Sequence, residues 1–166
     1  VAAPDDDAPA PPLPPPVILA QTSGGDTHDL LARFRRERRA VLLGTTTFWE
    51  GVDFPGHELE ILIVTKLPFL VPDDPWVEAR RQRLDAAGEN GFESFVVRDA
   101  VLRLRQGIGR LIRRADDRGV VILLDSRLHT RPYGITFLNA LPASPRYCSD
   151  AAELAQVVAD FFAGPA

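Results

Sequence analysis

The sequence predicts an α/β layer fold with a mostly parallel central sheet. Short apolar runs typical of buried strands alternate with stretches of helical periodicity, in the order strand, helix, strand, strand, helix, helix, strand, helix. Hydrophobic residues make up 45% of the 166 residues and charged residues 25%, which suits a globular domain large enough to bury a core. No apolar run approaches the ~20 residues that a membrane helix needs, so we expect a cytoplasmic chain with no membrane partner.

The amino-terminal part predicts a linker followed by the first strands. Residues 1–16 contain seven prolines, and we expect a linker or insertion there, because proline fixes φ and donates no backbone hydrogen bond. Residues 17–166 are expected to form one domain. Its first elements are predicted as a strand at 17–21, a helix from Asp26 or Thr27 to Arg39, a strand at 40–44, and a strand at 60–66 covered on both faces.

The second half predicts three helices and one more strand. These are a helix from Asp73-Asp74-Pro75 to about Ala87, a long helix beginning near Phe95, a strand at 119–125, and a final helix capped by Ser149 or Asp150. In open parallel sheets, ligands gather at the carboxyl ends of the strands. The loop at 45–56 and the tripeptide Asp125-Ser126-Arg127 each directly follow a predicted strand, so we expect chemistry there.

Charge and cysteine content exclude several classes of protein. The net charge of −4 argues against a free-standing, strongly basic nucleic-acid binder, although arginines cluster at 33–39, 80–83 and 103–114. The single cysteine, Cys148, excludes an intrachain disulfide and a cysteine-rich metal site built by this chain alone. Because the chain opens with valine and has no methionine, we expect a piece of a longer protein.

The long helix that passes through residues 106–114 has two different faces. At 100° per residue, one side carries the apolar residues Val97, Val101, Leu104, Ile108, Leu111 and Ile112, and the opposite side carries Asp99, Arg103, Gln106, Arg110 and Arg113. Gly107 and Gly109 interrupt this helix at a cost of ~1 kcal/mol each relative to alanine. We expect them to let another molecule approach the backbone closely. Spacing alone leaves open a solvated basic face with two incidental glycines.

The loop at 45–56 is rich in threonine, glycine and carboxylates. Threonine hydroxyls and glycine amides suit phosphate oxygens. Glu50 and Asp53 are able to hold an arginine or a ribose hydroxyl. The alternative is a capped connection in which Phe48 and Trp49 belong to the core.

Both segments resemble helicase motifs. The pattern Gln-x-x-Gly-Arg-x-x-Arg at 106–113 resembles motif VI of superfamily 2 helicases, and residues 44–56 resemble motif V of the DinG/XPD helicases. Lys66-Leu67-Pro68-Phe69, the turn at 116–119, Leu124-Asp125-Ser126-Arg127 and Tyr133-Gly134 are similar to later landmarks of that family, in the same order. The resemblance spans about residues 17–142. It implies the C-terminal, second RecA-like motor domain of an ATP-dependent DNA helicase, with a three-layer α/β/α fold that lacks a P-loop.

For motif VI, the resemblance implies residues that act on ATP. Arg113 is expected to be the arginine finger on the γ-phosphate, with Arg110 beside it. Gln106 is expected to contact the γ-phosphate or the attacking water, and Gly109 to lie at the nucleotide.

For motif V, the resemblance implies a link between nucleotide and DNA. Asp53 and Glu50 are expected on the nucleotide side. Thr46, Thr47 and Gly51 are expected to meet the backbone of single-stranded DNA. The implied process is DNA repair, with single-stranded or overhang DNA and the N-terminal helicase domain as partners.

Parts that ATP hydrolysis requires are missing from the sequence. No Gly-x-x-x-x-Gly-Lys-Ser/Thr phosphate loop is present. Ser126 rather than glutamate follows the Walker B-like strand that ends at Asp125. We therefore expect ATP and Mg²⁺ to be bound mainly by the first motor domain of the same polypeptide, and this chain to be inactive alone. No metal ligand is predicted in this chain, and any iron–sulfur cluster is expected in the missing half.

Two other readings stay open at this point. A nucleic-acid-binding α/β module with no ATPase role is consistent with the missing phosphate loop. A dinucleotide-binding domain fits the α/β pattern, but Gly107-x-Gly109 lacks the third glycine and lies within a helix.

Overall fold

A computed structural model of the chain describes residues 14–21, 26–45, 54, 58–111 and 118–164, without the side chains of residues 110 and 111. The chain divides into two compact units, Val1–Thr45 (unit 1) and Thr46–Ala166 (unit 2). Each unit pairs its strands in parallel, as the predicted α/β class requires. Within the described residues, no helix has the length and apolar character needed to cross a membrane.

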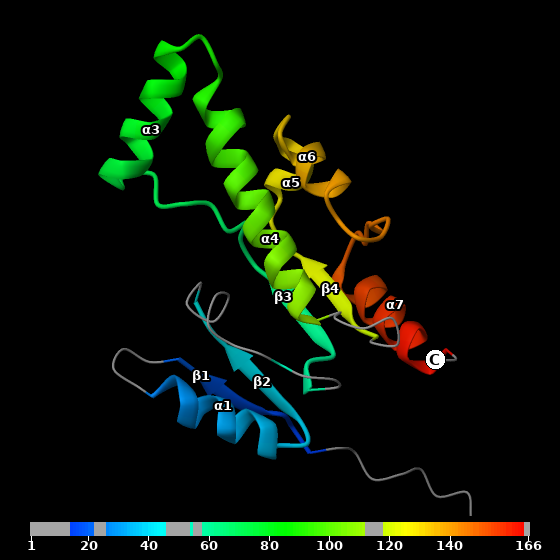
Figure 1. Cartoon of the computed structure of the whole chain (residues 1–166). Coiled ribbons are helices and arrows are strands. Elements are labelled where there is room, and N and C mark those ends of the chain that lie inside the picture. Colours follow the sequence, from blue (N-terminus) through cyan, green and yellow to red (C-terminus); the bar gives the residue numbers. More distant parts are fainter. Residues whose placement is uncertain (1–13, 22–25, 46–53, 55–57, 112–117, 165–166) are drawn as a thin grey trace, which may run out of the picture. The chain divides into compact units, whose positions relative to one another are not determined.

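Unit 1 is a small β-α-β arrangement (Figure 1). Strand β1 (Val17–Ala20) pairs in parallel with β2 (Ala40–Leu43), and helix α1 (Thr27–Arg36) packs on this pair. The Asp26 carboxylate caps α1 by accepting a hydrogen bond from the backbone N–H of His28 at 2.8 Å, so of the two predicted caps, Asp26 and Thr27, Asp26 is the N-cap. The helix ends at Arg36 rather than Arg39. Residue 39 already belongs to the sheet, because its carbonyl accepts a hydrogen bond from the N–H of Val17 at 3.0 Å.

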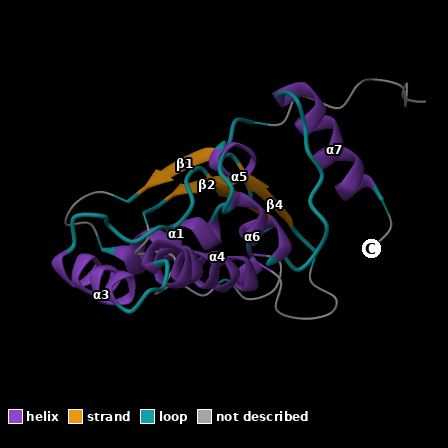
Figure 2. Cartoon of the chain, turned by 90° about the horizontal axis from the view of Figure 1, so that it is seen from above, coloured by secondary structure: helices purple, strands orange, loops and turns teal. Residues whose placement is uncertain are grey.

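Unit 2 is built around strands β3 (Ile61–Val64) and β4 (Val120–Leu123). They pair in parallel with Ile61 opposite Val120 and Val64 opposite Leu123. Its helical elements are α3 (Pro75–Ala86), the π-helix η2 (Phe92–Val97), α4 (Arg98–Leu111), α5 (Arg127–Thr130), α6 (Gly134–Asn139) and α7 (Ala151–Ala163). Figure 2 shows α3 beside the helix that continues into α4, and η2 is the part of that helix in contact with α3.

The core of unit 2 lies where α4, β3 and the short helices meet. Its buried members are Val64, Leu67, Val97, Ala100, Leu104, Ile108, Leu128 and Phe137. The predicted apolar face of the long helix is confirmed at Val97, Leu104 and Ile108, which are at most 3% exposed. The prediction that the strand at 60–66 is covered on both faces is wrong for β3 in this structure, because Ile61 and Ile63 are 37% and 52% exposed.

Caps fix the boundaries of the other long helices. The Asp74 carboxylate accepts hydrogen bonds from the N–H groups of Trp76 and Val77 at the start of α3. At the start of α7, the Asp150 carboxylate accepts a hydrogen bond from the N–H of Glu153 at 2.9 Å, so Asp150 and not Ser149 is the N-cap. The long helix was predicted to begin near Phe95, whereas the π-helix η2 begins at Phe92. Neither α5 nor α6 was predicted from the sequence.

Candidate active site and nucleic-acid interface

Residues 106–111 of motif VI form the carboxyl-terminal part of α4. Leu104 and Ile108 point inward, being 1% and 3% exposed, while Gln106 and Gly109 are exposed. The predicted two-faced helix is therefore confirmed where its side chains are described. Arg110 lies on α4, but its side chain is outside the described structure, as is the whole of Arg113.

The two glycines of motif VI have different environments. Gly107 is buried, whereas Gly109 is exposed. A Cβ atom added at Gly109 would meet no heavy atom within 4 Å. Packing against the described residues therefore does not require glycine at position 109.

Arg103, another arginine of α4, forms an ion pair within the helix. The Arg103 Nε donates to a carboxylate oxygen of Asp99 at 2.7 Å, one helical turn away. Arg103 was predicted on the same face as the motif VI arginines. Its guanidinium is thus engaged with a carboxylate of the same helix.

The carboxyl ends of β3 and β4 are held together by Asp125. Its side chain is 6% exposed and accepts a hydrogen bond from the N–H of Leu67 at 2.8 Å, across 58 positions of sequence. The Arg127 guanidinium donates to both carboxylate oxygens through Nε and through Nη2, the latter at 2.6 Å. The hydrogen bonds from Arg127 and the N–H of Leu67 lower the pKa of Asp125 to about 2, against the opposing effect of burial. Asp125 is thus an ionised anchor for the segment that follows β3.

An aromatic cluster extends from this anchor. The Arg127 guanidinium lies 5.0 Å from the ring centroid of Phe69, and the hydrogen bond to Asp125 raises the pKa of Arg127. Phe69 contacts Tyr133 and Phe137 edge to face, each at 5.6 Å between centroids. The landmark segments at 66–69, 125–127 and 133–134 are therefore brought together in one cluster.

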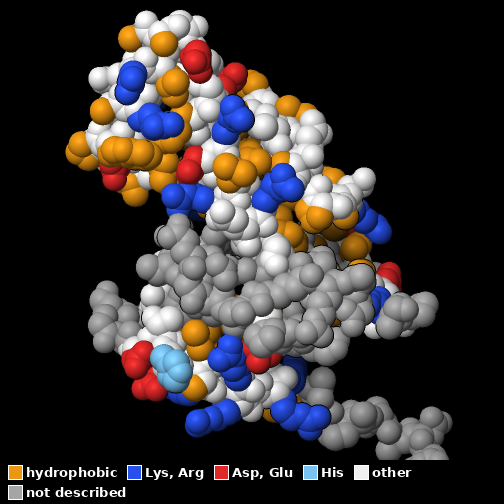
Figure 3. Space-filling view, viewed as in Figure 1, with side chains coloured by type: hydrophobic (Ala, Val, Ile, Leu, Met, Phe, Trp, Pro, Cys, Tyr) orange, Lys and Arg blue, Asp and Glu red, His pale blue; other side chains and the backbone are white. Residues whose placement is uncertain are grey.

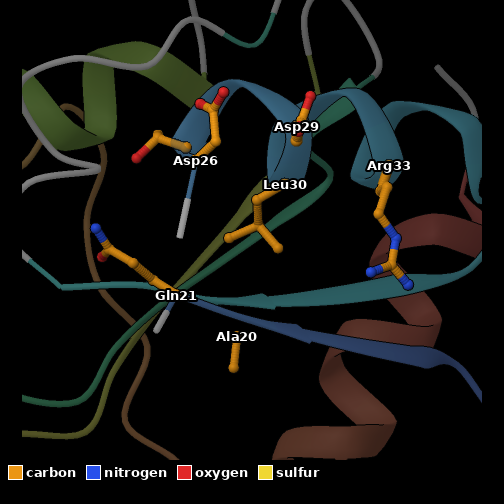
Figure 4. Close-up of a pocket in the computed structure, with 7 residues that line it drawn as sticks. Ala20, Gln21, Asp26, Asp29, Leu30 and Arg33 are labelled. Atoms are coloured by element: carbon orange, nitrogen blue, oxygen red, sulfur yellow. The ribbon is translucent and has the colours of Figure 1, made fainter. Parts of the chain in front are cut away.

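In unit 1, two hydrogen bonds hold Thr45, the second residue of motif V, against Gln21. The backbone N–H and the hydroxyl of Thr45 both donate to Oε1 of Gln21, at 3.2 and 2.9 Å. Gln21 lines a pocket of about 330 Å³ at the carboxyl end of β1, with Leu30 of α1 pointing toward Gln21 and Ala20 (Figure 4). No functional role was predicted for Gln21. The pattern that points to Gln21 is a polar residue placed directly after the apolar strand β1.

The predicted motif V residues Thr46, Thr47, Glu50, Gly51 and Asp53 lie outside the described residues. The next described residue, Phe54, is buried at 8% exposure. In the part of the chain that the structure describes, no cluster of three or more histidine, cysteine or acidic residues is suited to hold a metal ion.

The sequence of the chain matches a known protein family. Residues 11–144 match the sequence profile of the helicase C-terminal domain. The chain belongs to this family. It is 48% identical over 132 residues to the ATP-dependent DNA helicase YoaA of Escherichia coli, covering 79% of this chain and 20% of that relative.

Other relatives extend the comparison. The chain is 46% identical over 128 residues to the 3'-5' exonuclease DinG of Bacillus subtilis, covering 76% of this chain and 14% of that protein. It is 43% identical over 116 residues to the ATP-dependent helicase DinG of Mycobacterium tuberculosis, covering 70% of this chain and 18% of that protein. The predicted DinG-like superfamily 2 helicase C-terminal domain and its RecA-like α/β fold class are confirmed. The chain spans a fifth or less of the length of these three relatives.

Proposed function

We propose that this helicase C-terminal domain is the second motor half of an ATP-dependent DNA helicase. It supplies the arginine finger and part of the single-strand groove, and ATP binds at its interface with a Walker A/B domain of the same polypeptide. The observation that carries the proposal is the described part of motif VI at the end of α4, where Gln106 is exposed and a Cβ atom at Gly109 would meet no described atom within 4 Å. The sequence similarity to proteins named as ATP-dependent DNA helicases supports the same activity for the whole polypeptide.

The proposed chemistry depends on where charge develops during phosphoryl transfer. Negative charge spreads over the equatorial oxygens of the transferred phosphoryl group in the transition state. Arg113 stabilises that charge, with Arg110 beside it, and Gln106 contacts the γ-phosphate or the attacking water. Gly109 lets the nucleotide approach the helix. Mg²⁺ is held by the first motor domain, because a phosphate loop and its Ser/Thr ligand are absent from this sequence.

Motif V couples the nucleotide to the DNA in this proposal. Glu50 and Asp53 link the loop to the nucleotide and to the motif VI arginines. Thr46, Thr47 and Gly51 contact the backbone of the single strand. Closing of the cleft on ATP and reopening after hydrolysis then moves the strand, as expected of an enzyme of DNA repair in the cytoplasm.

The test is ATP turnover by the full polypeptide in the presence of single-stranded DNA. Arg113→Ala should lower kcat by roughly 10³-fold or more with little change in ATP affinity, because an arginine finger acts mainly in the transition state. Arg113→Lys should not restore kcat, since an ammonium group lacks the planar fork.

The matched control is Arg103→Ala, which removes an arginine of the same helix that is paired with Asp99. It should cost stability of the order of an i,i+4 helical ion pair, ~0.3–0.5 kcal/mol, and leave kcat nearly unchanged. A kcat near wild type in Arg113→Ala would refute the assignment of motif VI.

A further inference from the structure

An arginine sits between two aromatic rings where α3 meets η2. Trp76 of α3 and Phe95 of η2 contact edge to face, with 5.6 Å between ring centroids. The Arg80 guanidinium carbon lies 5.8 Å from the Trp76 centroid and 5.0 Å from that of Phe95. We refer to Trp76, Arg80 and Phe95 as the stacking cluster.

Burial does not explain the tryptophan of this cluster. Trp76 is 61% exposed, whereas its neighbour Val77 is 5% exposed and anchors α3 in the core. A tryptophan that served only to hold α3 would bury most of its surface. Arg80 covers one face of the indole, so much of the remaining ring surface stays open to solvent.

The π-helix η2 adds a second independent observation. π-turns are rare and occur frequently at functional sites. The six residues of η2 present Phe95 to the stacking cluster and Phe92, which is 37% exposed, to Phe69 at 6.3 Å between nearly parallel rings. One unusual helical turn thus places two aromatic residues at the surface of unit 2.

Positive charge accompanies these rings. Arg81 is paired with Glu78 at 2.7 Å and with Asp85 at 3.3 Å. In contrast, Arg80, Arg83 and Arg98 are exposed and form no ion pair with the described part of the chain. Hydrophobic, basic and acidic side chains lie next to one another over α3 (Figure 3), and the exposed Asp73 and Asp74 precede Trp76 by three and two residues. The surface at the stacking cluster therefore combines open aromatic area with an arginine, Arg80, that forms no ion pair with the described residues.

We propose that the stacking cluster is a binding site for the bases of single-stranded nucleic acid. A base stacks on the open surface of Trp76, and Arg80 contributes a cation–π contact and attracts the adjacent phosphate. Base–aromatic stacking tolerates any sequence, because every base has a π-face, and it requires unpaired bases. The site extends the proposed function by adding a contact to the strand on α3, away from motifs V and VI in the sequence, and it rests on single-stranded DNA being the substrate.

The experiment measures binding of the full chain to a fluorescently labelled oligothymidine at low salt. Trp76→Ala should weaken binding about tenfold, within the range for alanine at stacked aromatic residues, and Arg80→Gln should weaken it by about threefold, as loss of one cation–π contact of 0.5–1 kcal/mol predicts. Trp76→Phe should keep most of the affinity, because a ring remains.

Two controls separate stacking from general effects. Tyr147→Ala removes an aromatic residue that is 69% exposed outside the cluster, and Arg83→Gln removes one unpaired positive charge from α3. Tyr147→Ala should leave binding unchanged, and Arg83→Gln should have a smaller effect than Arg80→Gln. A second readout is the intrinsic fluorescence of the tryptophans, which a stacked base quenches; this quenching should be reduced in Trp76→Phe although the strand still binds.

The outcomes distinguish this site from the proposed function. If Trp76→Ala binds as well as Tyr147→Ala, or if the quenching in Trp76→Phe equals that of the wild-type chain, the stacking site is refuted while the motor assignment stands. Equal loss of duplex and single-strand binding would also refute it and favour a nonspecific basic surface. If the wild-type chain fails to bind the single strand at all, both proposals on DNA fail. If Trp76→Ala fails to fold, the decrease in tryptophan quenching in Trp76→Phe still tests the stacking site.

Discussion

Replacing Asp125 with asparagine tests the anchor between β3 and β4. The buried carboxylate accepts hydrogen bonds from the N–H of Leu67 and from the guanidinium of Arg127. Asparagine retains one oxygen for Leu67, but it removes the negative charge and turns NH₂ donors toward Arg127. We expect the variant to lose stability in unit 2 without any change to the motif VI residues.

The pKa of Asp125 gives the size of the effect. It falls from 3.8 to about 2, chiefly through the hydrogen bonds from Arg127. At about 1.4 kcal/mol for each unit of pKa, this corresponds to about 2 kcal/mol of stability from the ionised carboxylate. Because the pKa is lowered in the folded state, that stability is present above about pH 4 and is lost as the pH falls toward about 2.

The assay is urea unfolding followed by far-UV circular dichroism at neutral pH and at steps down to about pH 2. At neutral pH the free energy of unfolding of Asp125→Asn should be about 2 kcal/mol below wild type, and the difference should shrink between about pH 4 and pH 2. Glu78→Gln is the matched control, because it makes the same chemical change in a pair whose side chains are 38% and 41% exposed, where solvent screens the charges. A neutral-pH difference within the ~0.5 kcal/mol of ordinary surface substitutions, or one that is constant with pH, would refute the reasoning.

Two further predictions concern this chain tested on its own. It should show no ATP turnover, since it lacks a phosphate loop; steady hydrolysis that Arg113→Ala abolishes would contradict this. It should bind single-stranded DNA weakly and with strong salt dependence, because it offers part of a groove and carries a net charge of −4. Titrations between about 50 and 200 mM salt check this, and an affinity that does not change over that range would exclude a phosphate-based interaction.

The sequence predicted the elements whose signals are local. Asp26, Asp74 and Asp150 each mark a helix start through a cap formed within three residues. Four strands and the apolar face of α4 followed from apolar runs and from helical periodicity. A local signal also precedes η2: the Asn90 side chain accepts a hydrogen bond from the N–H of Glu93, as a helix cap does.

Other features depend on contacts that no local pattern specifies. The hydrogen bond from the N–H of Leu67 to the Asp125 carboxylate joins residues that are 58 positions apart in the sequence. Helix α6 requires glycine at its start, because a Cβ atom at Gly134 would lie 2.1 Å from the carbonyl oxygen of Leu128. A six-residue π-helix inside a longer apolar run leaves no distinct periodicity. The candidate site followed from the motif pattern, whereas the Trp76 cluster required the approach of α3 to η2, which spacing does not encode.

Substituting the glycines with alanine separates a structural glycine from one that serves a ligand. A methyl group at Gly109 meets no described atom within 4 Å, so Gly109→Ala should stabilise α4 by about 0.5–1 kcal/mol through higher helix propensity. If the proposed function holds, the same methyl group obstructs the nucleotide at motif VI, and kcat/KM for ATP should fall by about tenfold or more, since small misplacements at a reacting group are costly.

Gly134→Ala is the opposite case and serves as the control. Its new methyl group overlaps the backbone of Leu128, so it should cost about 1–3 kcal/mol of stability, as overpacking does. Unfolding free energies and kcat/KM measured on both variants distinguish the two roles. A Gly109→Ala variant that is more stable and fully active would mean that nothing approaches the helix there, and motif VI would then be the solvated basic face that its spacing alone also permits. A variant that is more stable and less active is the pattern expected where glycine is kept for a ligand at the expense of the helix.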